Sequence, residues 1–273
     1  MLRRDAFHGT GQQKDVDLTP GHGNHGLQDP SGRDSTSPVP MRAAEILRPT
    51  FKRFLWHAYD HLGLLVAVNL LWLLMCAPVV TAPASTAALF RIGRKIASHE
   101  DVSIRDFFFG FRAHFLPAIK VGSFTLVVVF MLWVNVDFYS HLGGWATLPG
   151  MLLAAVMIWA GVFLALMHAH LHPLIADGDR ALRVLLSKSA LLTLDNVGYT
   201  VGVTVQAASV AAICVLTGAG LVLVLGSFTA LLLSCGHREL LKRYFPESPE
   251  AGEPEETRGW RDFWKPWESR RKE

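Results

Sequence analysis

Long stretches of this chain contain no charged residue, and they constrain its fold more than any other feature of the sequence. Two of them cover residues 62–90 and 196–236. A helix needs roughly 20 apolar residues to cross the ~30 Å hydrocarbon core of a bilayer, so both stretches can enter a membrane. Of the 273 residues, 18% are charged, against about a quarter in a typical soluble domain. The sequence therefore predicts an all-α fold, a polytopic bundle of transmembrane helices.

About five membrane helices are predicted from the apolar runs. The uncharged stretch 196–236 has 41 residues, twice what one helix needs, and the segment Thr217-Gly218-Ala219-Gly220 is expected to be the turn that divides it. The predicted spans cover about residues 62–80, 121–139, 145–171, 197–216 and 219–236. Two amphipathic cytoplasmic helices are predicted at about residues 84–98 and 103–116.

The predicted helices belong to one transmembrane domain over residues 41–244, between two polar tails. Residues 1–40 are rich in Gly, Pro, Asp, Ser and His and lack aliphatic periodicity, so we expect them to be disordered. Residues 245–273 form a charged tail that is rich in tryptophan.

Two prolines are expected to break the first span. A straight helix over residues 62–90 would measure about 43 Å, which is too long for the hydrocarbon core. Pro78 and Pro83 lie on either side of Thr81, and each removes a backbone donor and disfavours helix before it. Either the first span crosses fully, or the break is the tip of a hairpin that returns the chain to the side from which it came.

Basic residues near the ends of the spans indicate the orientation. Lys and Arg mark the cytoplasmic side in short loops, and they cluster in residues 91–120, 180–188 and 238–243. The hairpin is favoured because it places every basic cluster, and both termini, on the cytoplasmic side of the cell membrane. The net charge is only +3, and the basic residues lie beside apolar runs. The lipid bilayer is therefore the expected partner, and nucleic acid is not.

The two amphipathic helices carry the residues that we single out for partner docking. Their cationic and aromatic faces can pack on the lipid interface or on the bundle, and they can also dock a partner protein. The residues are Arg91, Arg94, Lys95, Asp106, Phe107, Phe108 and Phe111.

Few polar residues occur inside the predicted spans, and none of them is charged at mid-span. Ion-coupled transporters usually keep charged residues there. Asn69 and the row of Gly198, Gly202 and Gln206, spaced four apart, are expected to serve helix packing.

Histidine clusters are the remaining candidates for chemistry. His168 and His172 share a helix face, but a catalytic zinc needs three ligands. The sequence contains no pattern of an active site, so neither an enzyme activity, a cofactor nor a metal is predicted, with these two histidines as the weak metal candidates.

The first apolar stretch and the segment after it resemble the YesL-like family of bacterial integral membrane proteins, a family defined by an uncharacterised domain. The similar segments, in order, are Asn69–Leu74, Pro78–Thr81, Thr86–Phe90, Arg91–Lys95, Glu100–Asp101 and Asp106–Phe111. They cover about fifty residues, and Pro83 departs from the pattern because relatives commonly have Gly there. The resemblance implies a multi-span protein without an assigned activity.

Such proteins are often encoded beside carbohydrate uptake systems, so the resemblance suggests a non-enzymatic accessory that binds a sugar-transporter subunit or associates with itself. The alternative is a small transporter or permease subunit whose path lies at the broken helix. A third hypothesis is a metal or proton site on the histidines.

Overall fold

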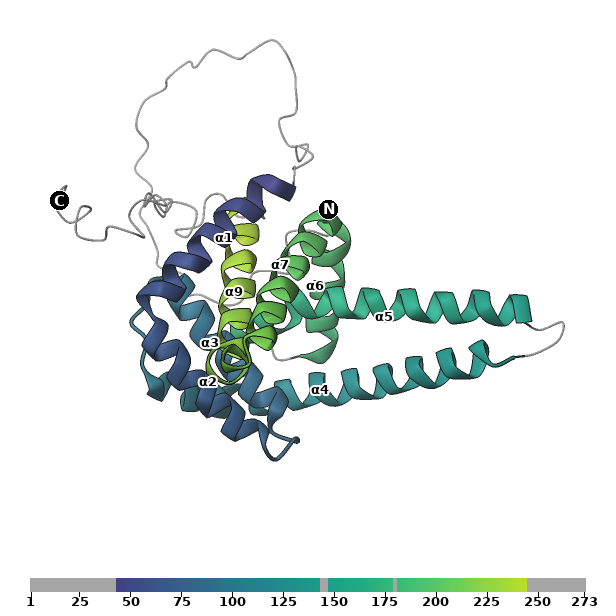
Figure 1. Cartoon of the computed structure of the whole chain (residues 1–273), viewed down its shortest axis with the longest axis horizontal. Coiled ribbons are helices and arrows are strands. Elements are labelled where there is room, and N and C mark those ends of the chain that lie inside the picture. The colour runs from purple at the N-terminus through teal and green to yellow at the C-terminus, as the bar shows by residue number, and fades with distance from the viewer. Residues whose placement is uncertain (1–42, 143–146, 179–180, 245–273) are drawn as a thin grey trace, which may run out of the picture. The chain divides into compact units, whose positions relative to one another are not determined.

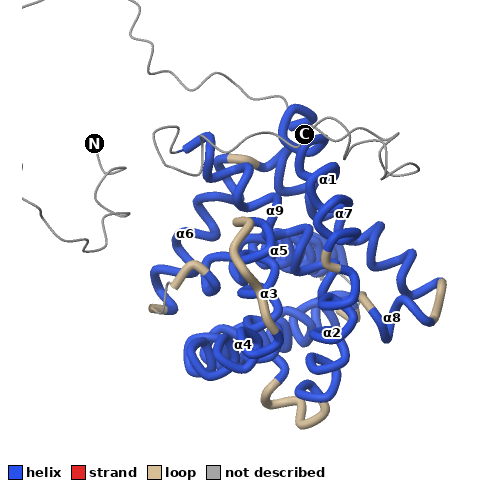
Figure 2. Tube along the Cα trace, turned by 90° about the vertical axis from the view of Figure 1, so that its left-hand side faces the viewer, coloured by secondary structure: helices blue, strands red, loops and turns tan. Residues whose placement is uncertain are grey.

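The computed structural model describes residues 43–142, 147–178 and 181–244, and within these ranges every regular element is a helix (Figures 1 and 2). The helices are α1 (Ala43–Asp60), α2 (Leu62–Cys76), α3 (Ala82–Ala97), α4 (Ile104–Ser140), α5 (Thr147–Ala176), α6 (Leu182–Asp195), α7 (Val197–Leu216), α8 (Ala219–Leu223) and α9 (Leu225–Tyr244). The all-α prediction is confirmed for these residues. The predicted tails, 1–40 and 245–273, lie outside them.

Helix α3 lies at the centre of the packing. It contacts α1, α2, α4, α5 and α9, and most of its residues are buried. Its first half consists largely of small residues, including Ala84, Ser85, Ala87 and Ala88. Small side chains allow helix backbones to approach closely. The segment after the two prolines is therefore the core of the bundle, although the sequence predicted it as an amphipathic helix at the cytoplasmic surface.

Helices α4 and α5 form a long pair whose outer ends extend away from the other helices (Figure 1). Large apolar side chains are exposed along both outer ends, including Phe130, Trp133, Leu152 and Trp159. Exposed apolar surface of this extent is not typical of a soluble monomer, whereas lipid covers it at no cost. The outer ends of this pair are therefore suited to a bilayer.

The predicted amphipathic helix 103–116 and the predicted span 121–139 form one continuous helix of 37 residues, α4. The helix begins as the sequence suggests: the Ser103 backbone N–H donates to Asp106 Oδ2 at 2.9 Å. It continues through Pro117, which is buried inside the helix. The prediction of two separate helices was wrong. Neither Pro117 nor the charges near residue 120 end α4, because neighbouring helices hold it in place.

Among the described residues, three helices are long and apolar enough to cross a membrane, namely α4, α5 and α7. A fourth crossing is possible by length if α1 and α2, which meet at an angle of 89°, are counted as one broken span. The predicted span 62–80 ends earlier, because α2 stops at Cys76, two residues before Pro78. The predicted span 219–236 is divided into α8 and α9 at Val224.

Candidate functional site

The two prolines lie at a tight turn between α2 and α3. Pro78 is in the turn, Pro83 is in the first turn of α3, and the hydroxyl group of Thr81 donates to the carbonyl of Met75. Proline suits the first turn of a helix because the backbone N–H that it lacks has no partner there. After the turn, the two helices lie against each other, and Trp72 Nε1 donates to the hydroxyl of a threonine on α3 at 3.2 Å.

Asn69 joins three helices through its amide group. It is fully buried in α2, and its Nδ2 donates to the carbonyl of Val222 at 2.7 Å. Its Oδ1 accepts from the backbone N–H groups of Gly226 and Ser227, at 2.9 and 3.0 Å. These two N–H groups belong to the first turn of α9, where they have no partner within the helix. Asn69 therefore caps α9 and binds the end of α8, a more specific role than helix packing.

The residues singled out for partner docking separate into buried and exposed groups. Phe107 is fully buried and Phe111 packs against the core. Lys95 and Asp106 form an ion pair of 3.0 Å. Burial opposes the ionisation of Asp106, but hydrogen bonds from the Ser103 backbone and from Lys95, together with the charge of Lys95, outweigh it and lower its pKa below the ordinary 3.8. These four predicted docking residues hold the fold together.

Two phenylalanines remain on the surface at the start of α4. Phe108 is 45% exposed and Phe109 is 61% exposed. The guanidinium carbon of Arg91 lies 4.8 Å from the centre of the Phe109 ring, as in a cation–π pair. Phe109 was missed from the sequence, because helical spacing placed it off the apolar stripe. The same helical spacing does indicate that Phe109 is exposed on α4.

The row of small and polar residues on α7 faces α1. Gly198 lies beside Ala43, and Gly202 leaves room for the side chain of Leu47. Gln206 Nε2 donates to the carbonyl of Leu47 at 3.4 Å. A side chain at Gly202 would collide with Leu47, so this glycine permits the close approach of the two helices.

The two histidines of the predicted weak metal site lie beside each other, with 6.0 Å between their ring centres, and each has a further neighbour. His168 Nε2 lies 3.2 Å from the hydroxyl oxygen of Thr125 on α4. The ring of His172 stacks on Phe90, with 5.0 Å between ring centres. Among the residues that the structure describes, no three His, Cys, Asp or Glu side chains gather closely enough to hold a metal ion.

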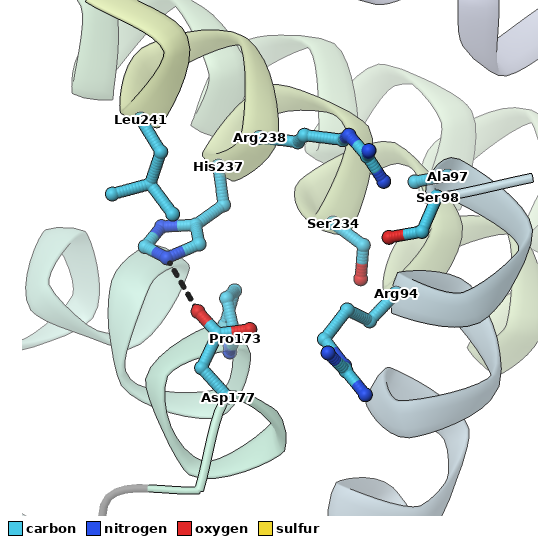
Figure 3. Close-up of a pocket in the computed structure, with 9 residues that line it drawn as sticks. All are labelled: Arg94, Ala97, Ser98, Pro173, Asp177, Ser234, His237, Arg238 and Leu241. Carbon is cyan, nitrogen blue, oxygen red and sulfur yellow. Dashed lines mark hydrogen bonds and ion pairs between the residues drawn. The ribbon is translucent and has the colours of Figure 1, made fainter. Parts of the chain in front are cut away.

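A pocket of about 220 Å³ lies where the C-terminal ends of α3 and α5 meet α9 (Figure 3). Its lining combines cationic, hydroxyl, acidic and imidazole groups. The lining residues are Arg94, Ala97, Ser98, Pro173, Asp177, Ser234, His237, Arg238 and Leu241. Of these residues, only Arg94 was predicted from the sequence to be functional, and in a different role, as part of a partner-docking surface.

The pocket has a cationic side and an acidic side. Arg94 and Arg238 lie on one side, next to Ser234 (Figure 3). On the other side, His237 Nε2 donates to Asp177 Oδ2 at 3.1 Å. Arg94 Nε, Ser234 Oγ and His237 Nδ1 are among the buried side-chain atoms of the described residues that have no hydrogen-bond partner. The lining therefore suits a polar ligand, and the pocket is a candidate binding site among the described residues.

Over the residues that the structure describes, these features define an all-α protein with three helices that are long and apolar enough for a membrane. Residues 65–136 match the model of a family described as "Protein of unknown function, DUF624". The matched region begins in α2, contains the proline turn and all of α3, and ends within α4. Neither a curated protein nor a solved structure is similar to the chain.

Proposed function

We propose that this chain is a multi-pass protein of the cell membrane that works as a non-enzymatic accessory in carbohydrate uptake by binding a subunit of a sugar transporter. One observation supports partner binding above all. Phe108 and Phe109 are exposed, and Arg91 lies against the ring of Phe109, while the neighbouring Phe107 is fully buried. Aromatic and arginine side chains are the residues that most often carry the binding energy of protein interfaces.

Phe108 and Phe109 lie at the opposite end of α4 from its exposed apolar outer end. Phe108 and Phe109 lie in the first two turns of α4, whereas the exposed apolar stretch of the helix occupies its other end, beyond residue 120. Burying a phenylalanine side chain contributes about 1.5–3 kcal/mol. Two of them contribute at most about 3–6 kcal/mol, which offsets part of the cost of association, so they serve as an anchor within a larger interface.

The proposal includes a finer membrane arrangement than the three long helices. About five membrane helices are proposed. The first forms a hairpin whose tip is the proline turn and does not cross, and the other four cross, so both termini lie in the cytoplasm. Helix α2 has 15 residues, which corresponds to about 22 Å, so it reaches into a bilayer without crossing it. Labelling of a cysteine placed within residues 1–40 on intact cells tests this arrangement. Protection of that cysteine is expected, and labelling from outside would refute the hairpin.

The partner is tested by photocrosslinking in native membranes. A photoreactive amino acid is introduced at position 108 or 109. As a matched control, it is introduced at Phe124 or Phe130, which are exposed farther along α4. We expect only the first pair to yield an adduct with a permease or ATPase subunit of a sugar importer. Adducts with a second copy of this chain would support self-association instead, and identical products at both pairs of positions would refute docking at Phe108 and Phe109.

The alternative function is a small transporter or permease subunit with its path at the proline turn. It predicts that the purified chain alone moves a sugar into liposomes. The accessory proposal predicts no uptake above that of empty liposomes, so a single flux measurement separates the two functions.

A further inference from the structure

The pocket between α3, α5 and α9 has a chemistry that the proposed function does not use. We propose that it binds a phosphate ester whose substituent carries hydroxyl groups. Four ionisable groups face the pocket: Arg94, Arg238, Asp177 and His237. Two guanidinium groups and one carboxylate belong to the lining, and guanidinium groups suit an anion.

The cationic side of the pocket suits the phosphoryl group. Guanidinium groups bind phosphate oxygens through two parallel, charge-assisted hydrogen bonds. Arg94 Nε is buried and has no hydrogen-bond partner. Ser234 is 5% exposed, and its hydroxyl, which also has no partner, points into the pocket between the two arginines (Figure 3). Buried donors are rarely left unpaired in proteins, and a phosphate oxygen would satisfy both.

The acidic side of the pocket selects the rest of the ligand. Asp177 Oδ2 is held by His237 at 3.1 Å, and a carboxylate keeps further lone pairs for other donors. A bare phosphate ion would be repelled by this carboxylate. A hydroxylated substituent would instead donate hydrogen bonds to it, while keeping the phosphate on the side of the arginines.

The size of the pocket limits the substituent. Its volume of about 220 Å³ lies below the roughly 300–1,000 Å³ of pockets for drug-sized ligands. A glycerol phosphate group is of suitable size. It can come from soluble glycerol 3-phosphate or from the headgroup of phosphatidylglycerol, and the two sources need separate tests.

Binding is measured on the full chain purified in a zwitterionic detergent. Calorimetry is done with glycerol 3-phosphate and with inorganic phosphate, and native mass spectrometry compares phosphatidylglycerol with phosphatidylcholine. The wild type is expected to bind at least one of the two glycerol phosphate sources, and to prefer glycerol 3-phosphate to inorganic phosphate and phosphatidylglycerol to phosphatidylcholine. A chain that binds neither source at millimolar concentration would overturn the proposal.

Two substitutions locate the site. Arg94→Gln is expected to weaken binding about tenfold or more, the effect of losing a hydrogen bond to a charged group. The matched control, Arg105→Gln, changes an exposed arginine of α4 that does not line the pocket, and it should leave the affinity unchanged. If Arg94→Gln does not fold, Ser234→Ala replaces it, with an expected loss of about two- to tenfold. Wild-type affinity in the folded variant would overturn the site.

Asp177→Asn tests the contribution of the acidic side. Removing the carboxylate removes the repulsion of inorganic phosphate, so the preference for glycerol 3-phosphate should shrink. An unchanged preference would refute the role of Asp177 in recognising hydroxyl groups.

Discussion

Replacing Asn69 with leucine should destabilise the junction of α2, α8 and α9. The substitution keeps the approximate shape of the side chain, so it creates no cavity. It removes the acceptor for the N–H groups of Gly226 and Ser227, at 2.9 and 3.0 Å, and the donor to the carbonyl of Val222, at 2.7 Å. The substitution therefore leaves three backbone groups at the break between α8 and α9 without these hydrogen-bond partners.

The size of the effect follows from these three bonds. A buried polar group left without its partner costs about 1–3 kcal/mol, and hydrogen bonds between membrane helices average about 0.6 kcal/mol, with a maximum near 1.7. Since water enters this buried junction poorly, we expect a total loss of about 2–4 kcal/mol in the free energy of unfolding.

The measurement is reversible unfolding in mixed micelles, followed by tryptophan fluorescence as the fraction of SDS increases. The control is Asn135→Leu, because Asn135 Nδ2 donates within its own helix, to the carbonyl of Met131, on an exposed part of α4. The control should lie within about 0.5 kcal/mol of the wild type, as surface substitutions usually do. If Asn69→Leu is as stable as the control, Asn69 does not cap α9.

Two further predictions concern the packing of α3 and its ion pair with α4. Gly93→Ala places a Cβ atom 3.0 Å from the carbonyl oxygen of Ala230, so overpacking should cost about 1–3 kcal/mol in the free energy of unfolding. Gly63→Ala, with nothing within 4 Å of the new Cβ atom, should instead stabilise α2 by up to about 1 kcal/mol. Thermal unfolding of the two variants measures this contrast, and equal midpoints would contradict it. Asp106→Asn should destabilise the protein at pH 7, because the lowered pKa of Asp106 means that its ionised form, paired with Lys95, stabilises the fold above the ordinary pKa. This difference should disappear as the pH falls through the lowered pKa, and a difference that persists at low pH would show that the charge is not its cause.

The sequence by itself determined the class of the protein and most of its helices. The backbone polar groups of a long uncharged run in lipid are satisfied in a helix. Proline can end a helix through local backbone geometry, and α2 does end before Pro78, although Pro117 lies inside α4. The stop of α2 before Pro78, the start of α4 at Ser103 and the position of α7 all follow from such local rules. They need no knowledge of the rest of the chain.

Only the tertiary structure decided which residues on each helix face inward. Phe107 and Phe108 are adjacent and chemically identical, yet one is fully buried and the other is 45% exposed, because α3 covers only one side of α4. The same limit explains the candidate site. Asp177 and His237 are separated by 60 positions in the sequence, and Asn69 meets its partners across more than 150 positions. Local patterns carry no information on such pairs, since the helices that bring them together are positioned by packing across the whole bundle.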